Sequence, residues 1–208
     1  MNERPEKQAV SPDAEPLETV VHLDERNWLA RHCRGDRDAF AELMNAYQSS
    51  LYGYLVRCGV PSAHRDDVFQ EIFVKIHLAA ASYQPSRPLR PWLFTIAANS
   101  VRNHLRDESR RRGFGDAPAD SRPSADHGPQ ALAEIDETVA WLEQALPQLP
   151  LDQREVLLLG SVGGLRLQDI ATVLDIPLNT VKTLTRRARM SLANALAEHV
   201  AGAAGGVV

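Results

Sequence analysis

The chain has 208 residues, of which 44% are hydrophobic and 24% are charged. This composition is typical of globular proteins and excludes a wholly disordered chain, and no apolar run approaches the roughly 20 residues that span a bilayer. The net charge of −4 argues mildly against nucleic-acid binding, because such domains are usually basic. The polar N-terminus lacks the apolar stretch of a signal peptide, so we expect a cytoplasmic protein with no direct membrane insertion.

Charge is unevenly distributed along the chain. Residues 1–25 are strongly acidic, whereas residues 102–112 contain five arginines against two acids. A second basic cluster, at residues 182–189, contains one lysine and three arginines. Contact with phosphate depends on local charge, because salt screens charges more than about 10 Å apart. The two basic stretches therefore indicate a protein that contacts DNA at two places.

Apolar periodicity and turn residues predict two small all-α domains joined by a flexible linker. Apolar residues recur every three or four positions on both sides of the linker, and no strand-like alternation is long enough for a sheet. The stretch between them is rich in Gly, Pro, Asp and Ser. The expected order is acidic tail, first domain, linker, second domain and flexible end, at residues 1–23, 24–112, 113–133, 134–200 and 201–208.

The first domain is predicted to contain four amphipathic helices. Gly35 ends the first helix, and Asp36 is a candidate N-cap of the second. Residues 59–61 break the second helix, and Ser62 is a candidate N-cap of the third. A proline-rich loop precedes the fourth. Four such helices can bury a shared core.

The third predicted helix carries an outward polar face beside a second apolar stripe. Phe69 and Phe73 form the stripe, next to the carboxylates, and such a combination is typical of a protein-binding face. The outward face comprises Asp67, Gln70, Glu71 and Val74. A catalytic acid pair is the alternative interpretation. No His, Ser or metal-ligand cluster accompanies the acids in the sequence, so we expect neither catalytic residues nor a bound metal or cofactor.

Residues 167–199 have the pattern of a helix-turn-helix, with a short helix, a tight turn at 175–177 and a long helix. Val181, Ala188 and Leu192 fall on one side of the long helix. The opposite side carries Asn179, Lys182, Thr183, Arg186, Arg187 and Arg189. Arginine can read guanine in the major groove, while Lys and Thr contact phosphates and base edges. A solvated charged face on an ordinary helical hairpin is the competing interpretation.

Three stretches, taken in order, resemble extracytoplasmic-function sigma factors of the sigma-70 family. The first is DDVFQEIFVKIH at 66–77, which resembles a helix of the second conserved region. The second is RPWLFTIAANSVRNHLRDESRRR at 90–112, which resembles the family's −10 recognition motif. The third, at 146–192, resembles the fourth region, which binds the −35 element. The resemblance covers roughly residues 25–199.

The resemblance implies a region 2 helical bundle, a region 4 helix-turn-helix and a non-enzymatic role in transcription initiation. The implied partners are promoter DNA, core RNA polymerase through its largest-subunit clamp and its flap, and an anti-sigma factor. Core-polymerase binding is assigned to Asp66, Asp67, Gln70, Glu71, Phe73 and Val74. Recognition and melting of the −10 element is assigned to Asn99, Asn103, Arg106, Arg110 and Arg111. Binding of the −35 element is assigned to Asn179, Thr180, Lys182, Thr183, Arg186, Arg187 and Arg189.

The chain departs from the family pattern at a few positions. Leu184-Thr185 stands where the family usually has Arg-Leu, so the buried position can shift by one residue and Arg186 can replace the missing arginine. Asn179 replaces a common glycine, and Ala98 replaces a common arginine. These changes bear on which promoter bases are read.

Other functional classes predict different behaviour. A stand-alone helix-turn-helix regulator binds specific DNA without polymerase, and a helical adaptor acts through protein contacts alone. Cys33 and Cys58 form no CxxC pair and are interpreted as reduced thiols. A redox or metal switch that uses them with His32 is the alternative interpretation.

Overall fold

The computed structural model describes residue 25, residues 27–112 and residues 140–204. The predicted acidic tail and linker, at 1–23 and 113–133, lie outside the described residues, and so does the end of the chain beyond 204. Every regular element in the described residues is a helix. No described helix combines the length and the apolar character that a bilayer span requires.

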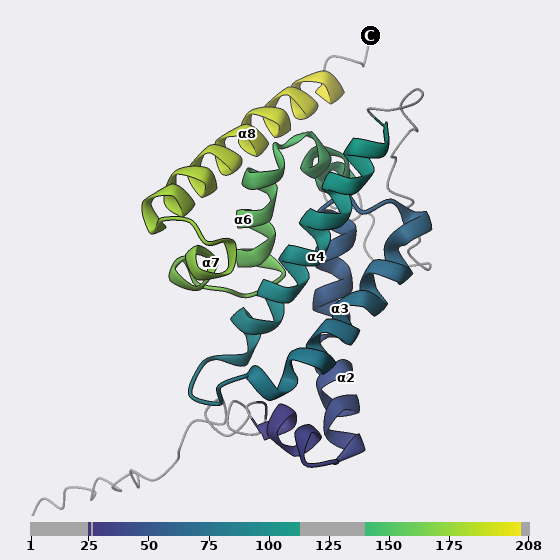
Figure 1. Ribbon diagram of the computed structural model, residues 1–208. Coiled ribbons are helices and arrows are strands. Elements are labelled where there is room, and N and C mark those ends of the chain that lie inside the picture. Colours follow the sequence, from purple (N-terminus) through teal and green to yellow (C-terminus); the bar gives the residue numbers. More distant parts are fainter. Residues whose placement is uncertain (1–24, 26, 113–139, 205–208) are drawn as a thin grey trace, which may run out of the picture.

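The helices form two groups along the chain (Figure 1). The first group begins with a helical segment at 27–33 and continues with α2 (Arg37–Arg57), η1 (Ser62–His64), α3 (Arg65–Ala79), η2 (Ala80–Ser82) and α4 (Leu89–Arg112). The second begins with a helical segment at 140–145 and continues with η3 (Leu146–Gln148), α6 (Leu151–Ser161), α7 (Leu167–Leu174) and α8 (Leu178–Ala204).

Local sequence signals explain where several helices begin. Asp36 caps α2, since its Oδ1 accepts hydrogen bonds from the amides of Asp38 and Ala39 at 3.0 and 3.3 Å, which confirms that prediction. The prediction that Ser62 caps α3 is wrong, because Ser62 starts the 3-10 turn η1 and α3 begins at Arg65. That turn separates the Ser62 hydroxyl from the first amides of α3.

The helix-turn-helix forms as the sequence predicts. Short helix α7 occupies the expected residues, and the long helix α8 continues to Ala204, past the expected end near His199. The carbonyl of Pro177 accepts hydrogen bonds from Thr180 and Val181, so the proline lies directly before α8. A proline is tolerated there because its missing N–H is not needed by the helix.

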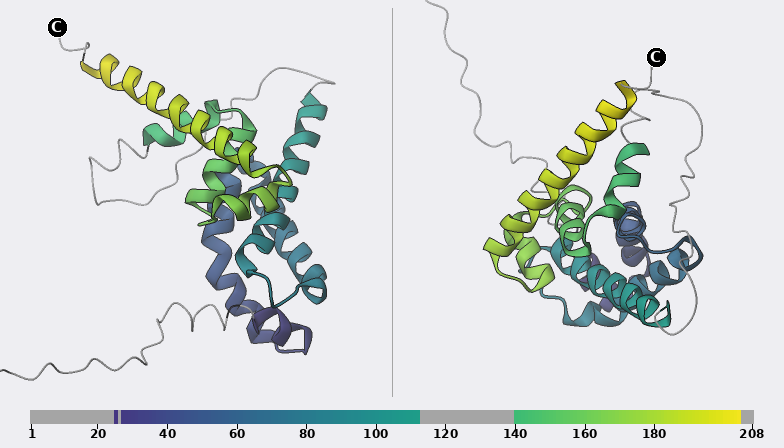
Figure 2. Two further views of the ribbon diagram at one scale, coloured as in Figure 1. Left: turned by 90° about the vertical axis from the view of Figure 1, so that its left-hand side faces the viewer. Right: turned by 90° about the horizontal axis from the view of Figure 1, so that it is seen from above.

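Helix α4 lies in the middle of the molecule and is covered on two sides. It contacts α2 and α3 in its own group and α7 in the second group, and Figures 1 and 2 show it between them. Its fully buried residues are Leu93, Phe94, Ala97, Ala98 and Val101. At 100° per residue they span an arc of about 140°, wider than a helix with a single buried face requires.

The buried side chains of both groups form one continuous core. Leu43, Ile72 and Leu93 of the first group belong to the same cluster as Leu159 and Val181 of the second. The sequence predicts two helical domains on a flexible tether, and the structure adds that they pack directly against each other. The second buried side of α4 explains how a shared core arises.

Candidate nucleic-acid and protein interfaces

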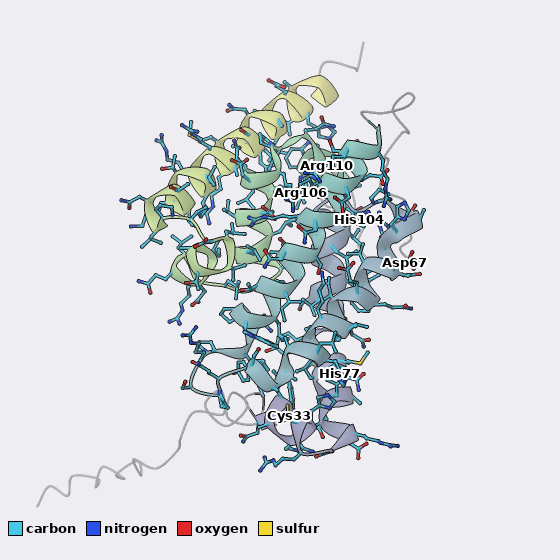
Figure 3. All side chains as sticks on the ribbon, in the orientation of Figure 1. Cys33, Asp67, His77, His104, Arg106 and Arg110 are labelled. Carbon is cyan, nitrogen blue, oxygen red and sulfur yellow. The ribbon has the colours of Figure 1, made fainter. Side chains whose placement is uncertain are left out.

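The α3 surface contains the six residues predicted to bind core polymerase. Asp66 and Asp67 lie in the first turn of α3, where carboxylates interact favourably with the helix dipole. Five of the six side chains are exposed, and Phe73 is buried beneath them. Figure 3 shows Asp67 at the edge of the molecule away from α8. The α3 surface is therefore open to a large partner.

An apolar hollow of about 390 Å³ lies beside these residues, between α2 and α3. Gln70, Phe73 and Val74 line it, as predicted for the α3 surface. The lining also includes Phe40, Met44, Phe69 and His77, which the sequence did not assign to this surface. Phe40 and Met44 are four residues apart on α2. Core residues of the same helix have this spacing too, so the sequence pattern does not distinguish the two groups. Val74 is 55% exposed at its rim, so the hollow is a candidate contact for apolar side chains of a partner.

One residue of the α3 surface is fixed by contacts inside the protein. Glu71 pairs with Lys75 one turn further along α3. Lys75 also donates a 3.0 Å hydrogen bond to the hydroxyl of Ser100, which is buried on α4. The hydrogen bond from Lys75 thus joins α3 to α4 beside the α3 surface.

The α4 surface consists of the five residues predicted to act on the −10 element, all of which are exposed. Asn103 accepts a hydrogen bond from Arg106. Arg110 and Arg111 form only long ion pairs with neighbouring acids, of 3.8 and 4.0 Å, and exposed pairs of this kind contribute little. Figure 3 shows Arg106 and Arg110 on the same end of α4. The surface can therefore exchange these internal contacts for bases and phosphates.

Histidines adjoin the α4 surface. The rings of His104, on α4, and His64 lie 5.2 Å apart. Burial lowers the pKa of His104, and His64 lowers it further. The buried Nε2 of His104 has no hydrogen-bond partner among the described residues. No local sequence pattern predicts this pair, because its members are 40 residues apart.

The α8 surface consists of the seven residues predicted to bind the −35 element. All seven are exposed, whereas Val181 and Ala188 on the opposite side are fully buried. Leu184 is buried and Thr185 is half-buried. Leu184 therefore occupies the inward position for which both residues were candidates. The hydroxyl of Thr185 donates to the carbonyl of Val181 at 2.8 Å. The helix thus has an apolar back and a cationic front.

A second hollow, of about 400 Å³, lies on this front between α7 and α8. Lys182, Arg186 and Arg189 line it together with the exposed Leu167 and Met190. Within the described part of the chain, the cations of the α8 surface form no ion pair with an acid. They are therefore available for phosphates and base edges.

The contact between the two groups centres on Glu155 of α6, a residue that the sequence did not single out. Its side chain is 2% exposed. Arg102 of α4 donates from Nε to both carboxylate oxygens, at 2.8 and 2.9 Å. Burial raises the pKa of Glu155, and the hydrogen bond from Arg102 opposes that rise. A buried carboxylate is stable here because a guanidinium from the other group pairs with it.

The cysteines occupy different environments. Cys33 is exposed, and Cys58 is completely buried, where burial raises the pKa of its thiol. His32, which the sequence grouped with them, instead shares a 2.8 Å ring-nitrogen hydrogen bond with His77. In the described ranges, no three His, Cys, Asp or Glu side chains are placed to hold a metal ion.

The arrangement defines a class of protein: an all-helical protein in which a helix-turn-helix with a cationic face packs against a helical bundle. Two family models match the chain, one in each helical group. Residues 43–111 match Sigma-70 region 2, and residues 140–192 match Sigma-70, region 4. The curated relatives include the RNA polymerase sigma-H factor of Pseudomonas aeruginosa, 35% identical over 78% of this chain and 89% of the relative. The ECF RNA polymerase sigma-E factor of Escherichia coli K12 is 30% identical over 77% and 88%, respectively.

Solved structures extend the likeness to the whole arrangement. A structure of CnrH in complex with the cytosolic domain of CnrY covers 84% of this chain and 98% of its own, with 26% identity and a TM-score of 0.64. The fold is also that of the sigma factor RpoE in complex with the anti-sigma factor NepR from Bartonella quintana, at 22% identity, a TM-score of 0.61 and coverage of 76% and 96%. The chain belongs to the sigma-70 family and is a sigma factor of the extracytoplasmic-function type, which directs RNA polymerase to promoters.

Proposed function

We propose that this sigma factor acts through three separate surfaces. The α3 surface binds the clamp of core polymerase, the α4 surface recognises and melts the −10 element, and the α8 surface binds the −35 element. The first domain, 24–112, serves as region 2 and the second, 134–200, as region 4, with 113–133 as the linker. The observation that carries the proposal is the two-sided character of α8, in which every predicted −35 residue is exposed opposite a buried apolar side.

The chemistry of the α4 surface supports its role in melting. An unpaired base must be held by new contacts that offset the loss of stacking. Asn99 and Asn103 each offer an amide donor and an acceptor for base edges, and both are exposed. Arg106, Arg110 and Arg111 supply positive charge for the phosphates on either side.

The partners follow from the same surfaces. Two weak DNA contacts on one chain gain effective concentration when polymerase holds them at the promoter spacing. One similar structure holds a sigma factor with an anti-sigma factor, and another holds CnrH with the cytosolic domain of CnrY. Both support an anti-sigma factor as a partner of this chain. The protein works in the cytoplasm, as a non-enzymatic subunit of polymerase, and requires no cofactor.

Transcription in vitro tests this function. Core polymerase with this protein should start RNA synthesis at a specific set of sites in a genomic library. The triple change Lys182→Ala, Arg186→Ala and Arg187→Ala removes cations of the α8 surface, so it should abolish promoter binding and leave core-polymerase binding within about twofold. A control with the same charge change, at the exposed Arg34, Arg37 and Arg87, should retain promoter binding.

Each competing function predicts a different experimental result. Tight, sequence-specific DNA binding by the free protein would support a stand-alone regulator. Unchanged function of the α8 triple variant would support an adaptor that acts through protein contacts. If Cys33→Ser and Cys58→Ser leave regulation by oxidant and metal unaltered, the thiols have no sensing role.

A further inference from the structure

The hollow on the front of α8 combines cations with exposed apolar side chains. Lys182, Arg186 and Arg189 line it beside Leu167 and Met190, which are 39% and 53% exposed. Seven positions separate the first of these cations from the last, which places them about 10 Å apart along the helix. A ligand that fits this surface therefore carries negative charges about 10 Å apart, with an apolar group between them.

Residues 13–24, here called the acidic segment, have a complementary sequence, although they lie outside the described residues. The acidic segment contains four acids and neither lysine nor arginine. Glu15 and Glu18 are three residues apart, which is about 10 Å in an extended chain, and Leu17 lies between them. Pro16 favours an extended backbone at Glu15, because a residue before proline avoids the helical region. The acids thus have the spacing of the cations in the hollow.

The residue that follows the acidic segment lies close to the hollow. Glu25 accepts a 3.0 Å hydrogen bond from the hydroxyl of Tyr47, and the guanidinium of Arg90 lies 5.2 Å from the centroid of the Tyr47 ring. Arg90 in turn donates to the carbonyl of Gly163 at 3.1 Å, and Leu167 begins α7 four residues later. Two side chains therefore connect Glu25 to the loop that leads into α7. The twelve residues of the acidic segment span about 40 Å when extended, so they can reach the hollow.

We propose that the acidic segment docks on the front of α8, with its carboxylates against the three cations and Leu17 in the hollow, and that it competes there with DNA. This inference rests on the −35 role proposed above for the α8 surface. Because the segment is tethered to the protein, its effective concentration at the hollow is on the order of millimolar, so weak contacts are enough. Competition lowers the affinity for all DNA by one factor, and weakly bound non-promoter sites are vacated first.

The cationic α4 surface fits the acidic segment less well. Arg110 and Arg111 lie 3.8 and 4.0 Å from acids of the same helix, which offset their charge. Among the residues that the structure describes, the cations of the α8 surface form no such pair. Figure 3 shows Arg110 at the opposite end of the molecule from Cys33, which belongs to the first helical segment. Charge and position therefore both favour α8.

Photo-crosslinking of the free full-length protein tests the contact directly. A benzophenone amino acid introduced at Leu17 should crosslink within the same chain to peptides that contain Leu167 or Met190, since both side chains line the hollow. Excess duplex DNA should lower the yield roughly fivefold, because DNA and the acidic segment compete for the same cations. Crosslinks to α4 or to a second copy, or a yield no higher than in urea, would overturn the docking.

Neutralising the acids tests the competition with DNA. Glu15→Gln with Glu18→Gln should raise the affinity of the free protein for a non-promoter duplex roughly threefold or more, because the α8 surface is then occupied less often. Glu3→Gln with Glu6→Gln is the matched control: it removes the same charge at the same spacing outside the acidic segment, and it should change the affinity by less than about 1.5-fold. Fluorescence anisotropy of a labelled duplex measures both. Equal effects of the two pairs would reduce the acids to a long-range charge and overturn the docking.

Met190 separates docking from DNA contact, because it lines the hollow and is not among the residues assigned to the −35 element. Met190→Ser removes apolar contact for Leu17, so it should lower the crosslink from position 17 to the Leu167 peptide and raise the affinity for DNA roughly twofold. Circular dichroism shows whether the helices are retained. A folded Met190→Ser protein with full crosslinking and weaker DNA binding would overturn the docking, since that is the behaviour of a residue that contacts only DNA.

These outcomes are distinguishable from those of the proposed function, because crosslinking and anisotropy need neither polymerase nor a promoter. Promoter-specific transcription by the parent, together with no crosslink to the hollow and no effect of the Glu15 and Glu18 changes, would overturn the docking and leave the function standing. A parent protein that crosslinks as expected and directs no transcription would overturn the function and leave the docking standing.

Discussion

The turn of the helix-turn-helix depends on the backbone of Asp175. Among the described residues other than glycine, it alone has a positive φ, of 52°. Its amide bonds to carbonyls of the last turn of α7, and the Ile176 amide bonds to the carbonyl of Ala171 at 3.1 Å. This left-handed residue ends α7 and directs the chain into α8. Asp tolerates the conformation better than most side chains do.

Substitution at Asp175 should therefore follow backbone preference. Asp175→Val should lower the free energy of unfolding by about 1–2 kcal/mol, because a β-branched residue is strained in the left-handed region. Asp175→Gly should stay within about 0.5 kcal/mol of the parent, since its lower strain is offset by its greater freedom when unfolded. Urea unfolding followed by circular dichroism measures both. Equal losses in the two variants would contradict this account of the turn.

Single residues also show what the sequence could not decide. The periodicity of α8 left Leu184 and Thr185 as alternatives for the buried position, because both lie within about 60° of the inward direction. Leu184 is the residue that packs against the rest of the core. The hydroxyl of Thr185 instead donates a hydrogen bond to the carbonyl of Val181. The choice follows from volume and hydrogen bonding, which a periodic pattern does not contain.

At the scale of elements, helix α4 packs against both helical groups. Phe94, Ala98 and Arg102 follow at four-residue intervals, so they lie along one side of the helix. Phe94 and Ala98 are fully buried. Arg102 is the last residue of this stripe, and it pairs with Glu155. The sequence predicts the helix and its apolar residues correctly because these are local features. The sequence does not predict that the second group packs on this side of α4, because an apolar stripe can pack against any other apolar surface.

The stripe gives a test at Ala98, whose side chain is fully buried. Ala98→Arg should destabilise the protein by several kcal/mol or separate the two groups, because a long charged side chain would enter a fully buried position. Ala98→Ser, a matched small polar change, should cost about 1–3 kcal/mol or less. Thermal unfolding and scattering together separate the two outcomes. A compact, equally stable Ala98→Arg protein would show that this side of α4 is not tightly covered.

At the scale of the whole molecule, the two groups stabilise each other through one core. The Arg102–Glu155 contact joins residues 53 positions apart, and the Arg154–Cys58 contact joins residues 96 apart. Composition and turn residues predict two domains because these features depend only on residues that are close together in the sequence. Contacts at such separations depend on side-chain geometry across a tether, which explains why the sequence predicted the two modules and not their packing.

A shared core should make unfolding of the parent a single cooperative transition in scanning calorimetry. Neither group can unfold without exposing apolar surface of the other, so their stabilities are coupled. Arg102→Ala should split the transition in two, because it leaves the buried carboxylate of Glu155 without its cation and the separated groups no longer share that surface. Adding Glu155→Gln should merge the two transitions again. The measurement needs no polymerase and no DNA. Two separate transitions in the parent would show that the contact between the groups contributes too little to couple them, and a single unshifted transition in Arg102→Ala would show that the ion pair does not hold them together.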